Sequence, residues 1–590
     1  MRRVLFAVPL LVLIVVGAVS LGGMTLGACG DNGHKAAQDG GVDAVPDARL
    51  EGFDKPDLVC PGDPGCMTVG DGVLKVGVGK RDWTPAITET YTDENLDREW
   101  SSDEPYDDAN GNHKFDAVWV FGGGRAAEGV LQPVEARAIA FVQGDLKIVV
   151  LSVDAIGLLS MDMDKIRNHP NLAGVDVDQI IITSTHAHNA PDTIGLWGPT
   201  ATSTGRVPRV FDSLYENASL AVKDALANPV PVTMKIASTK LINDPTNPMS
   251  KTDDFNLDIR DPVIFDPTLT IAQFVTADSP TTTVATLVNW ADHPEIQNFA
   301  SDVPTQISSH YVHYLRDGIE NGVTTAQSFY TAGTNVPGLG GVAVFVQGAL
   351  GGQIGSIRTT HPKAPDGSYE THRGDPQERV IGYNAAALGL KALAATGETT
   401  SVLPLSFKSA AFAARVENTF LNVAFIIGLL GPDANSMLVG WDPDQGADIG
   451  NYPWMPLRAT FLQVGPMGLV TVPGELHPEL WVGGYDGSWS WGFPLLDMTK
   501  PNLPNFDDAP KPPYMRDLVL AHDGVKYPIC VGLAFNYIGY IVPHYNFVLS
   551  EDPYITEAEG DHYEEVYALS PDVERHAIDP ILELLKYRRP

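Results

Sequence analysis

The sequence has few basic residues for its length, and they do not gather into a stripe. Its 590 residues include 39 lysines and arginines against 73 aspartates and glutamates, which gives a formal net charge of -34. Such a surface repels nucleic acid and anionic membranes and favours solubility. A nucleic-acid partner is excluded, because no row of cations is present to neutralise phosphates.

Long apolar segments and short repeats are lacking as well. Beyond the N-terminus the most apolar run is Phe420–Leu430, well short of the ~20 residues that a membrane-spanning helix needs. This run predicts a buried core helix, and the alternative is a surface helix that meets lipid near a substrate entrance. A solenoid is disfavoured, because no period of about 20 to 50 residues is visible.

What the N-terminus does have is the pattern of a secretory signal. Arg2 and Arg3 precede the apolar run Val4–Val16, and small residues then lead to Leu26–Cys29. A basic start, a short apolar segment and a small-residue cleavage site are typical of a signal peptide. Leu-Gly-Ala before Cys29 resembles a bacterial lipobox, which implies a diacylglyceryl thioether on this cysteine; an ordinary signal peptide with an incidental cysteine is the alternative. We therefore expect a lipoprotein signal peptide over residues 1–28. The mature protein is expected to be lipid-anchored to the membrane and extracytoplasmic, in the periplasm or on the outer surface of a bacterial cell envelope.

The other cysteines divide between the N-terminal region and the body of the chain. Residues 29–68 are rich in Gly, Asp, Ala and Pro, and because they have little to bury they predict a disordered tether. Within it, Cys60 and Cys66 bracket a short Pro-Gly-Asp-Pro-Gly loop and form a candidate disulfide, since the expected compartment is oxidising. Cys530 is left over, and we expect it to be buried and inert.

Residues 69–590 can bury a large core, since 44% of the chain is apolar. Strand-like and helix-like segments alternate along them, which indicates an α/β, or mixed α+β, fold. The predicted strands are Ala136–Phe141, Lys147–Ser152, Asp178–Ser184, Thr268–Phe274, Thr283–Trp290 and Val342–Gln347, and the predicted helices are Met161–Asn168 and Phe211–Ala227. Reactive residues fall where some of these strands end, a usual arrangement because the strand fixes the backbone while the loop exposes the side chain.

Two histidines follow the strand that ends at Ser184. His186 and His188 stand in an i, i+2 relation, so both rings can face the same side. Neutral imidazole is a common zinc ligand, and a second imidazole can orient the first or move protons. A histidine pair with this spacing is weak evidence when it stands alone.

The histidine pair belongs to a series of blocks that resembles the neutral/alkaline ceramidase family. Thr185–Pro191 is similar to the family's His-Thr-His-Ser-Gly-Pro motif, and Asn289–Pro294 is similar to the segment that carries its second zinc histidine. Further similar blocks follow the family's order: Val76–Pro85, Gly122–Arg125, Gly129–Ala138, Val472–Glu475 and Tyr537–Tyr540. The resemblance spans residues 70 to about 570, and it implies one ceramidase-like catalytic domain over residues 69–590.

The same resemblance implies a zinc site. Family members bind one zinc through two histidines, a glutamate and a tyrosine, which fall here on His186, His293, Glu475 and Tyr540. Such a set suits a hydrolytic zinc with an open position, whose bound water is the expected nucleophile. His188 resembles a residue that transfers protons, and Tyr563 one that stabilises an oxyanion. Outside this context, Glu475 would be interpreted as an acid at a helix N-terminus, and His477 would compete with it as a ligand.

The sequence departs from the family's pattern in two places. The family's catalytic serine lies in a Gly-Asp-x-Ser-Pro segment after a glutamine, but after Gln347 the Asp and Ser positions fall on Gly352 and Ile354, and Ser356 comes two residues late. Family members also continue into an Ig-like domain, which we do not expect here. The implied function is a zinc-dependent hydrolase of linear N-acyl amides, sphingolipid-like or other. The alternatives are a zinc esterase of the same fold and a surface lipoprotein that binds a ligand without turnover.

A separate motif lies upstream of the histidines. Oxygen-bearing side chains of Asp108, Asn110, Asn112 and Asp116 are spaced as in a calcium loop of the EF-hand kind. His113 stands at the position of the loop glycine, and the bidentate glutamate that would close the loop is absent. The motif predicts either a structural calcium site or an Asp/Asn-rich solvated turn.

Overall fold

The computed structural model describes residues 72–241, 255–256, 258, 260–278, 282–299, 304–353, 361–440, 442 and 452–589. The predicted signal peptide and tether, with Cys29, Cys60 and Cys66, lie outside these described residues, as do Ile354 and Ser356.

The first part of the chain forms three antiparallel strands, a connecting helix, and a fourth strand that runs parallel to the third. The strands are β1 (Lys75–Asp82), β3 (Glu135–Gln143), β4 (Leu146–Val153) and β5 (Gln179–Ser184). Helix α2 (Ser160–Arg167) connects β4 to β5, and α3 (Pro208–Ala227) follows β5 and packs on β1 and β3. We call this arrangement of four strands, a connection and a closing helix a module.

The module occurs twice more, with the same strand order and the same strand directions. The second module contains β6 (Val230–Lys240), β7 (Thr268–Thr276), β8 (Thr283–Trp290), α4 (Tyr311–Asn321), β12 (Val342–Gln347) and α6 (Asp375–Thr396). The third contains β14 (Leu405–Arg415), β15 (Trp454–Val464), β16 (Met467–Thr471), α8 (Pro478–Val482), α9 (Met515–Leu520), β18 (Tyr527–Val531) and α10 (Val573–Leu584). In each module the closing helix packs on the first two strands.

Short elements decorate the modules. They are β2 (Gly129–Val130) paired with β9 (Gln306–Ile307), β10 (Gly322–Val323) with β11 (Val336–Pro337), β17 (Glu475–Leu476) with β19 (Tyr540–Ile541), β13 (Glu398–Thr400) at the edge of β6, helix α7 (Thr419–Ile426), and single 3-10 turns at Pro170–Leu172, Ile296–Phe299, Phe329–Thr331, Ala434–Met437, His544–Asn546 and Tyr563–Tyr567. A short contact between β1 and β6 joins the first two modules into a nine-stranded sheet.

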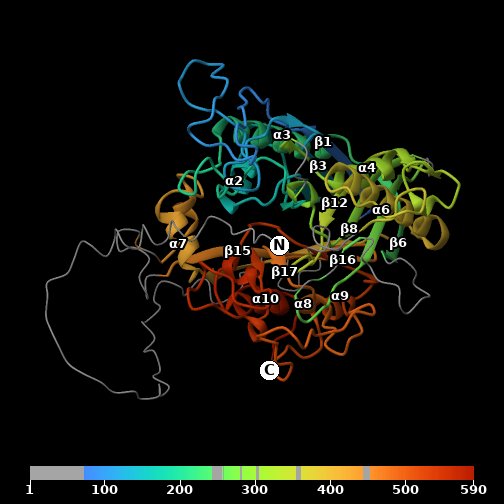
Figure 1. Ribbon diagram of the computed structural model, residues 1–590. Helices are drawn as coiled ribbons and strands as arrows, with labels where there is room; N and C mark the ends of the chain where they lie inside the picture. The colour runs from blue at the N-terminus through green and yellow to red at the C-terminus, as the bar shows by residue number, and fades with distance from the viewer. Residues whose placement is uncertain are drawn as a thin grey trace.

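One apolar core is shared by all three modules. The inner faces of the sheets meet there, with Phe141, Ile181, Met234, Phe274, Val344, Phe407, Leu462 and Ile529 among its buried side chains. Helices cover the outer faces, and a separate apolar cluster lies under the helices of each module. Figure 1 shows the modules as three sectors, blue to cyan, green to yellow, and orange to red. Because the inner and outer faces of each sheet are both covered, strands such as β5 are buried along their whole length.

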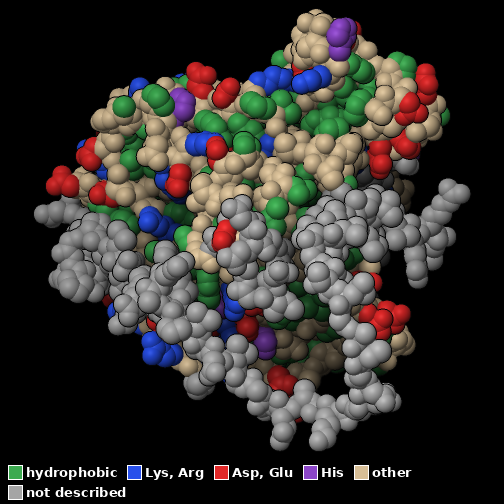
Figure 2. All heavy atoms as spheres, turned by 90° about the vertical axis from the view of Figure 1, so that its left-hand side faces the viewer, with side chains coloured by type: hydrophobic (Ala, Val, Ile, Leu, Met, Phe, Trp, Pro, Cys, Tyr) green, Lys and Arg blue, Asp and Glu red, His purple; other side chains and the backbone are tan. Residues whose placement is uncertain are grey.

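Charged side chains of both signs lie on the outer surface, as the composition predicts. Acidic side chains are spread among basic and apolar ones on the face shown in Figure 2. No helix among the described residues is long and apolar enough to span a membrane.

The structure confirms the predicted α/β class and the predicted strands and helices, with shifts of a few residues at their ends. The apolar run near residue 420 forms α7, and Phe420, Val423 and Phe425 are buried, which confirms a core helix. Cys530 is free and buried, as predicted. Burial raises the pKa of its thiol, so this cysteine is a poor nucleophile.

Candidate functional site

Each module contributes a residue of the predicted zinc site from just beyond the carboxyl end of a strand. His186 follows β5 of the first module, His293 follows β8 of the second, and Glu475 follows β16 of the third. All three side chains are buried, with at most 1% of their surface exposed. The ends of strands from all three modules therefore meet at one point.

Both histidine rings are fixed by backbone carbonyl groups. His186 Nδ1 lies 2.6 Å from the carbonyl oxygen of Ile156, and His293 Nδ1 lies 3.1 Å from that of Gln353. A carbonyl oxygen only accepts hydrogen bonds, so each Nδ1 must carry the proton. The bare Nε2 atoms then point at the same oxygen, with Glu475 Oε2 at 3.3 Å from His186 and 3.1 Å from His293.

This arrangement fits a bound cation. Burial lowers the pKa of His293, so its ring is neutral near pH 7. With both Nδ1 atoms protonated, two Nε2 lone pairs face the buried carboxylate of Glu475. A divalent ion among them would convert three mutually repelling acceptors into ligands.

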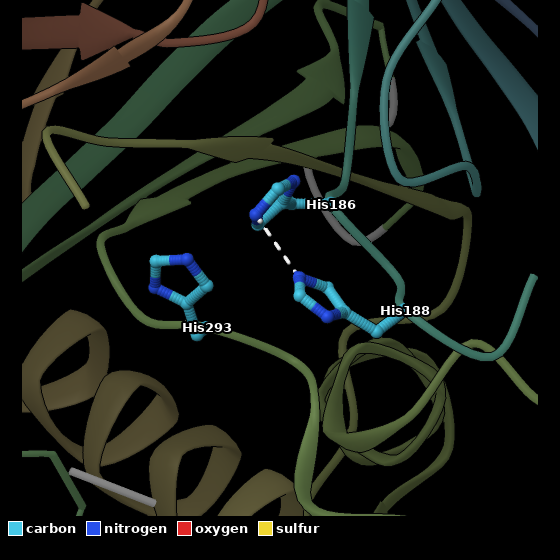
Figure 3. Close-up of side chains that lie close together, drawn as sticks. All are labelled: His186, His188 and His293. Atoms are coloured by element: carbon cyan, nitrogen blue, oxygen red, sulfur yellow. Dashed lines mark hydrogen bonds between the residues drawn. The ribbon is translucent and has the colours of Figure 1, made fainter. Parts of the chain in front are cut away.

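His188 lies beside this pair. Its Nε2 is 3.1 Å from His186 Nε2 (Figure 3), and the ligand atoms of His186, His188 and His293 lie within 4.8 Å of one another. On its other side, Nδ1 is 3.7 Å from Glu295 Oε2, and the ring packs on Phe121 at a centroid distance of 4.6 Å. Burial first, and then the neighbouring His186 and His293 rings, lower the pKa of His188 well below its usual value. His188 is therefore a neutral imidazole at the edge of the site.

Three tyrosines close the third-module side. The Tyr540 ring stacks near His293, at a centroid distance of 6.4 Å, and its hydroxyl lies 3.2 Å from that of Tyr563. Tyr537 donates a hydrogen bond of 2.7 Å to Glu475 Oε1. Burial raises the pKa of all three hydroxyls well above the usual value, so they are hydrogen-bond donors. Sequence reasoning missed Tyr537, although it opens the same Tyr-x-x-Tyr segment as Tyr540.

Two solved structures share the overall fold of this chain. A neutral ceramidase from Pseudomonas aeruginosa aligns over 88% of this chain and 76% of its own, with a TM-score of 0.53 and 15% sequence identity. A structure described as ceramidase complexed with C2 aligns over the same shares, with a TM-score of 0.52 and 14% identity. The chain has a neutral ceramidase-like fold. No protein-family model matches the sequence, and no curated protein sequence matches it.

Within the ceramidase-like fold, a buried arginine fixes the 3-10 turn Tyr563–Tyr567 through hydrogen bonds. Arg260 donates hydrogen bonds to Glu564 (2.9 Å), to both oxygens of Glu565 (2.6 and 2.9 Å) and to the carbonyl oxygen of Asn546 (2.6 Å). His562 Nδ1 lies 3.0 Å from Glu565 Oε1. The residues on both sides of Tyr563 are thereby fixed to a segment of the second module.

His477 does not join the metal-binding group. Its Nδ1 faces Glu479 Oε2 at 3.8 Å, and burial, followed by the nearby charge of Arg260, lowers its pKa to about 3. Glu475 itself lies in β17, and helix α8 begins beyond it at Pro478 with Glu479 in its first turn. The acid of the helix N-terminus is therefore Glu479, which leaves Glu475 free to face the histidines.

The structure accounts for the glycine at position 352. A Cβ atom there would lie 2.8 Å from Asp258 Oδ1, and Gly352 has a φ of +78°. Asp258 is buried and accepts the backbone N–H groups of Arg260 and Ile264. The Asp258 carboxylate thus occupies the space into which a side chain at position 352 would extend.

The predicted calcium loop is closed by its own side chains. Asp108 accepts the backbone N–H groups of Asn112 and His113, at 3.0 Å each, and Asp116 Oδ2 accepts the side-chain amides of Asn110 (2.7 Å) and Asn112 (2.8 Å). Most of the loop is exposed. Calcium binding here stays a prediction.

Proposed function

We propose that this protein is a zinc-dependent amidohydrolase that cleaves a linear N-acyl amide of a lipid-like substrate. The observation that carries the proposal is the convergence of two bare imidazole nitrogens on one carboxylate oxygen, with both rings locked by backbone carbonyls. His186, His293 and Glu475 would hold the ion, and a tyrosine hydroxyl would complete the set. Two histidines and a carboxylate form a common catalytic zinc site.

The substrate class is supported by the fold. The structures with which the chain aligns are described as ceramidases, and a ceramidase acts on an N-acyl amide of a lipid. An aromatic side chain beside the site agrees with such a ligand, since Phe121 packs between His188 and Trp197. The N-terminal sequence supports a lipid-anchored location outside the cytoplasm.

The roles of the residues follow from their positions. A bound zinc ion supplies Lewis-acid polarisation and lowers the pKa of water. His188, kept neutral by burial, would act as the general base toward the attacking water and return the proton to the leaving amine. Tyr563 is partly exposed, and its hydroxyl donates to the oxyanion that develops on the amide carbonyl. Tyr537 holds Glu475 in place through its hydrogen bond to Oε1.

The proposal is tested by metal analysis combined with a hydrolysis screen. Purified protein is expected to contain one zinc per chain and to cleave N-acyl lipids or N-acyl amino acids, with activity lost on chelation and restored by zinc. His186→Ala should lose both metal and activity. His522→Ala is the matched control, because His522 stacks on Phe461 outside the site and its loss should change neither.

Four outcomes would contradict the proposal. Protein without stoichiometric zinc, or full amide hydrolysis by His186→Ala, would exclude a zinc mechanism. Zinc-dependent cleavage of esters with none of amides would instead assign an esterase. Tight ligand binding without turnover of any substrate would assign a binding protein.

A further inference from the structure

Another buried histidine packs against the loop that carries His186 and His188. His310 precedes α4 and has no exposed surface. Its Nε2 accepts the backbone N–H of Asn189 at 2.9 Å, the residue directly after His188. Because an N–H group donates, Nε2 of His310 must be bare and its proton must lie on Nδ1.

That proton faces a buried glutamate. His310 Nδ1 lies 2.5 Å from Oε1 of Glu378, a residue of α6 that is also fully buried. The same oxygen accepts the backbone N–H of Gln297 at 3.2 Å. Gln297 lies four residues after His293, so Glu378 contacts the second histidine-bearing loop directly and the first one through His310.

The hydrogen-bonded contact between His310 and Glu378 carries energetic costs that a purely structural role would not require. Glu378 Oε2 is buried without a hydrogen-bond partner, and an unsatisfied buried carboxylate oxygen is destabilising. His310 has a φ of +57°, a conformation that costs a non-glycine residue of order 1–3 kcal/mol and is found preferentially at functional sites. An apolar contact between α4 and α6 would hold the helices together without leaving a buried oxygen unsatisfied.

We propose that His310 and Glu378 are positioning residues of the metal site. They hold the loop of His186 and the loop of His293 at a fixed separation, so that the two Nε2 atoms stay converged on Glu475. Neither residue touches the ion or the substrate. The inference rests on the proposed zinc site, and it adds a device that fixes the distance between two of its ligands.

The experiment measures metal binding on the full chain, so it needs no substrate. Zinc affinity is determined by competition with a chromophoric chelator, and the Co²⁺-substituted protein reports ligand geometry through its visible absorption spectrum. Glu378→Ala is expected to weaken zinc binding by about tenfold or more, the usual scale for supporting residues around a metal, and to alter the Co²⁺ spectrum. Glu378→Gln keeps an oxygen that accepts from both donors, so its effect should be smaller.

Glu320→Ala is the matched control. Glu320 Oε1 accepts a hydrogen bond from Arg137 Nη1 and the backbone N–H of Ala343, so it too joins a side chain to a backbone group. It contacts neither histidine loop, and its loss should lower stability without changing zinc affinity or the Co²⁺ spectrum.

The outcomes separate the two proposals. A wild-type protein that binds no zinc overturns the proposed function and this inference together. A wild-type protein that binds zinc, with Glu378→Ala folded and equal to it in affinity and spectrum, overturns only the positioning role. If Glu378→Ala does not fold, His310→Ala decides the matter, because it removes the acceptor of the Asn189 N–H; a folded His310→Ala variant with wild-type affinity and an unchanged Co²⁺ spectrum also overturns it.

Discussion

His186 has a backbone conformation that side chains rarely adopt. Its φ is +67°, and Leu533, at the equivalent place after the fourth strand of the third module, has a φ of +52°. Such strain persists only where the surroundings over-determine the conformation. For His186 the surroundings include the carbonyl of Ile156 and the facing Glu475, so the backbone turn that aims the ring is held from both ends.

The Tyr563 hydroxyl is expected to act on the reaction and not on metal binding. Tyr563→Phe should lower kcat by about 10²–10³-fold with little change in KM, the scale measured for removing one oxyanion donor. Steady-state kinetics with zinc content measured on the same sample would show this. Tyr567→Phe, on the same 3-10 turn, serves as the control and should leave kcat unchanged. An equal loss in both variants would assign the effect to the turn as a whole.

Tyr537 is expected to act on metal binding. Its hydroxyl orients Glu475, so Tyr537→Phe should weaken zinc binding by about tenfold. The family resemblance indicated Tyr540 as the ligand, so the zinc affinity of Tyr540→Phe is measured alongside. The larger loss of affinity shows which tyrosine contributes more to zinc binding. Unchanged zinc affinity in Tyr537→Phe would mean that Glu475 is held by the histidines alone.

Glu479 gives a pH-dependent stability with a definite sign. Burial raises the pKa of this carboxyl from 4.5 to about 7. As pH rises from 4.5 towards 7 the unfolded chain releases the proton while the folded chain keeps it, so the raised pKa destabilises the folded state increasingly over this range. Glu479→Gln does not titrate, and it should be more stable than the wild type above pH 7 by up to about 3 kcal/mol. Urea unfolding near pH 4 and near pH 8 checks this, and an equal difference at both would contradict it.

At the scale of elements, β1 and α3 approach unusually closely. A Cβ atom on Gly79 would lie 2.0 Å from the carbonyl oxygen of Ala221, and one on Gly77 would lie 2.1 Å from that of Ala225. The helix backbone cannot yield without losing its contacts to the sheet. Gly79→Ala should therefore destabilise the protein by about 1–3 kcal/mol or more, seen as a lower denaturant midpoint. Gly123→Ala is the control, because no atom lies within 4 Å of the added Cβ; an equal loss there would exclude steric overlap as the cause.

The elements differ in how far sequence alone could predict them. Runs of β-branched residues bounded by turn residues predicted Thr283–Trp290 and Val342–Gln347 as strands with their observed ends. Helix α3 begins before its predicted start, at Pro208. Proline has no backbone N–H group, but the N–H groups of the first helical turn have no acceptor within the helix, so proline is well suited to this position. The strand β14 gave no alternating pattern, since nearly all of its residues are buried.

The site was predictable where its residues follow strands, and less so elsewhere. His186, His293 and Glu475 stand in recognisable blocks just beyond the ends of buried strands, and the structure brings them together. Tyr537, His310 and Glu378 act through contacts between distant segments, such as the bond from His310 to α6. No local spacing in the chain indicates such a contact, because it depends on how whole helices pack.

At the scale of the whole molecule, the candidate zinc ligands come from all three modules. A bound ion would therefore stabilise the packing of the modules against one another as well as the site. Chelation is expected to lower the thermal midpoint. The free energy of unfolding should fall by about 4 kcal/mol if free zinc was near 1,000 times its Kd before chelation. Calorimetry with and without chelator measures the shift. His186→Ala should show none, and an equal shift in that variant would place the stabilising metal elsewhere.

The three-module arrangement also sets the order in which the protein can mature. A polypeptide leaves the ribosome N-terminus first, at about 5–20 residues per second. The two histidines of the first module therefore precede Glu475 by some tens of seconds, and Tyr563 is made later still. Fragments that end before the third module contain His186 and His293 but lack the carboxylate between them. Competence for the proposed zinc site is thus a late event of biosynthesis, one that marks a chain whose synthesis has reached the third module.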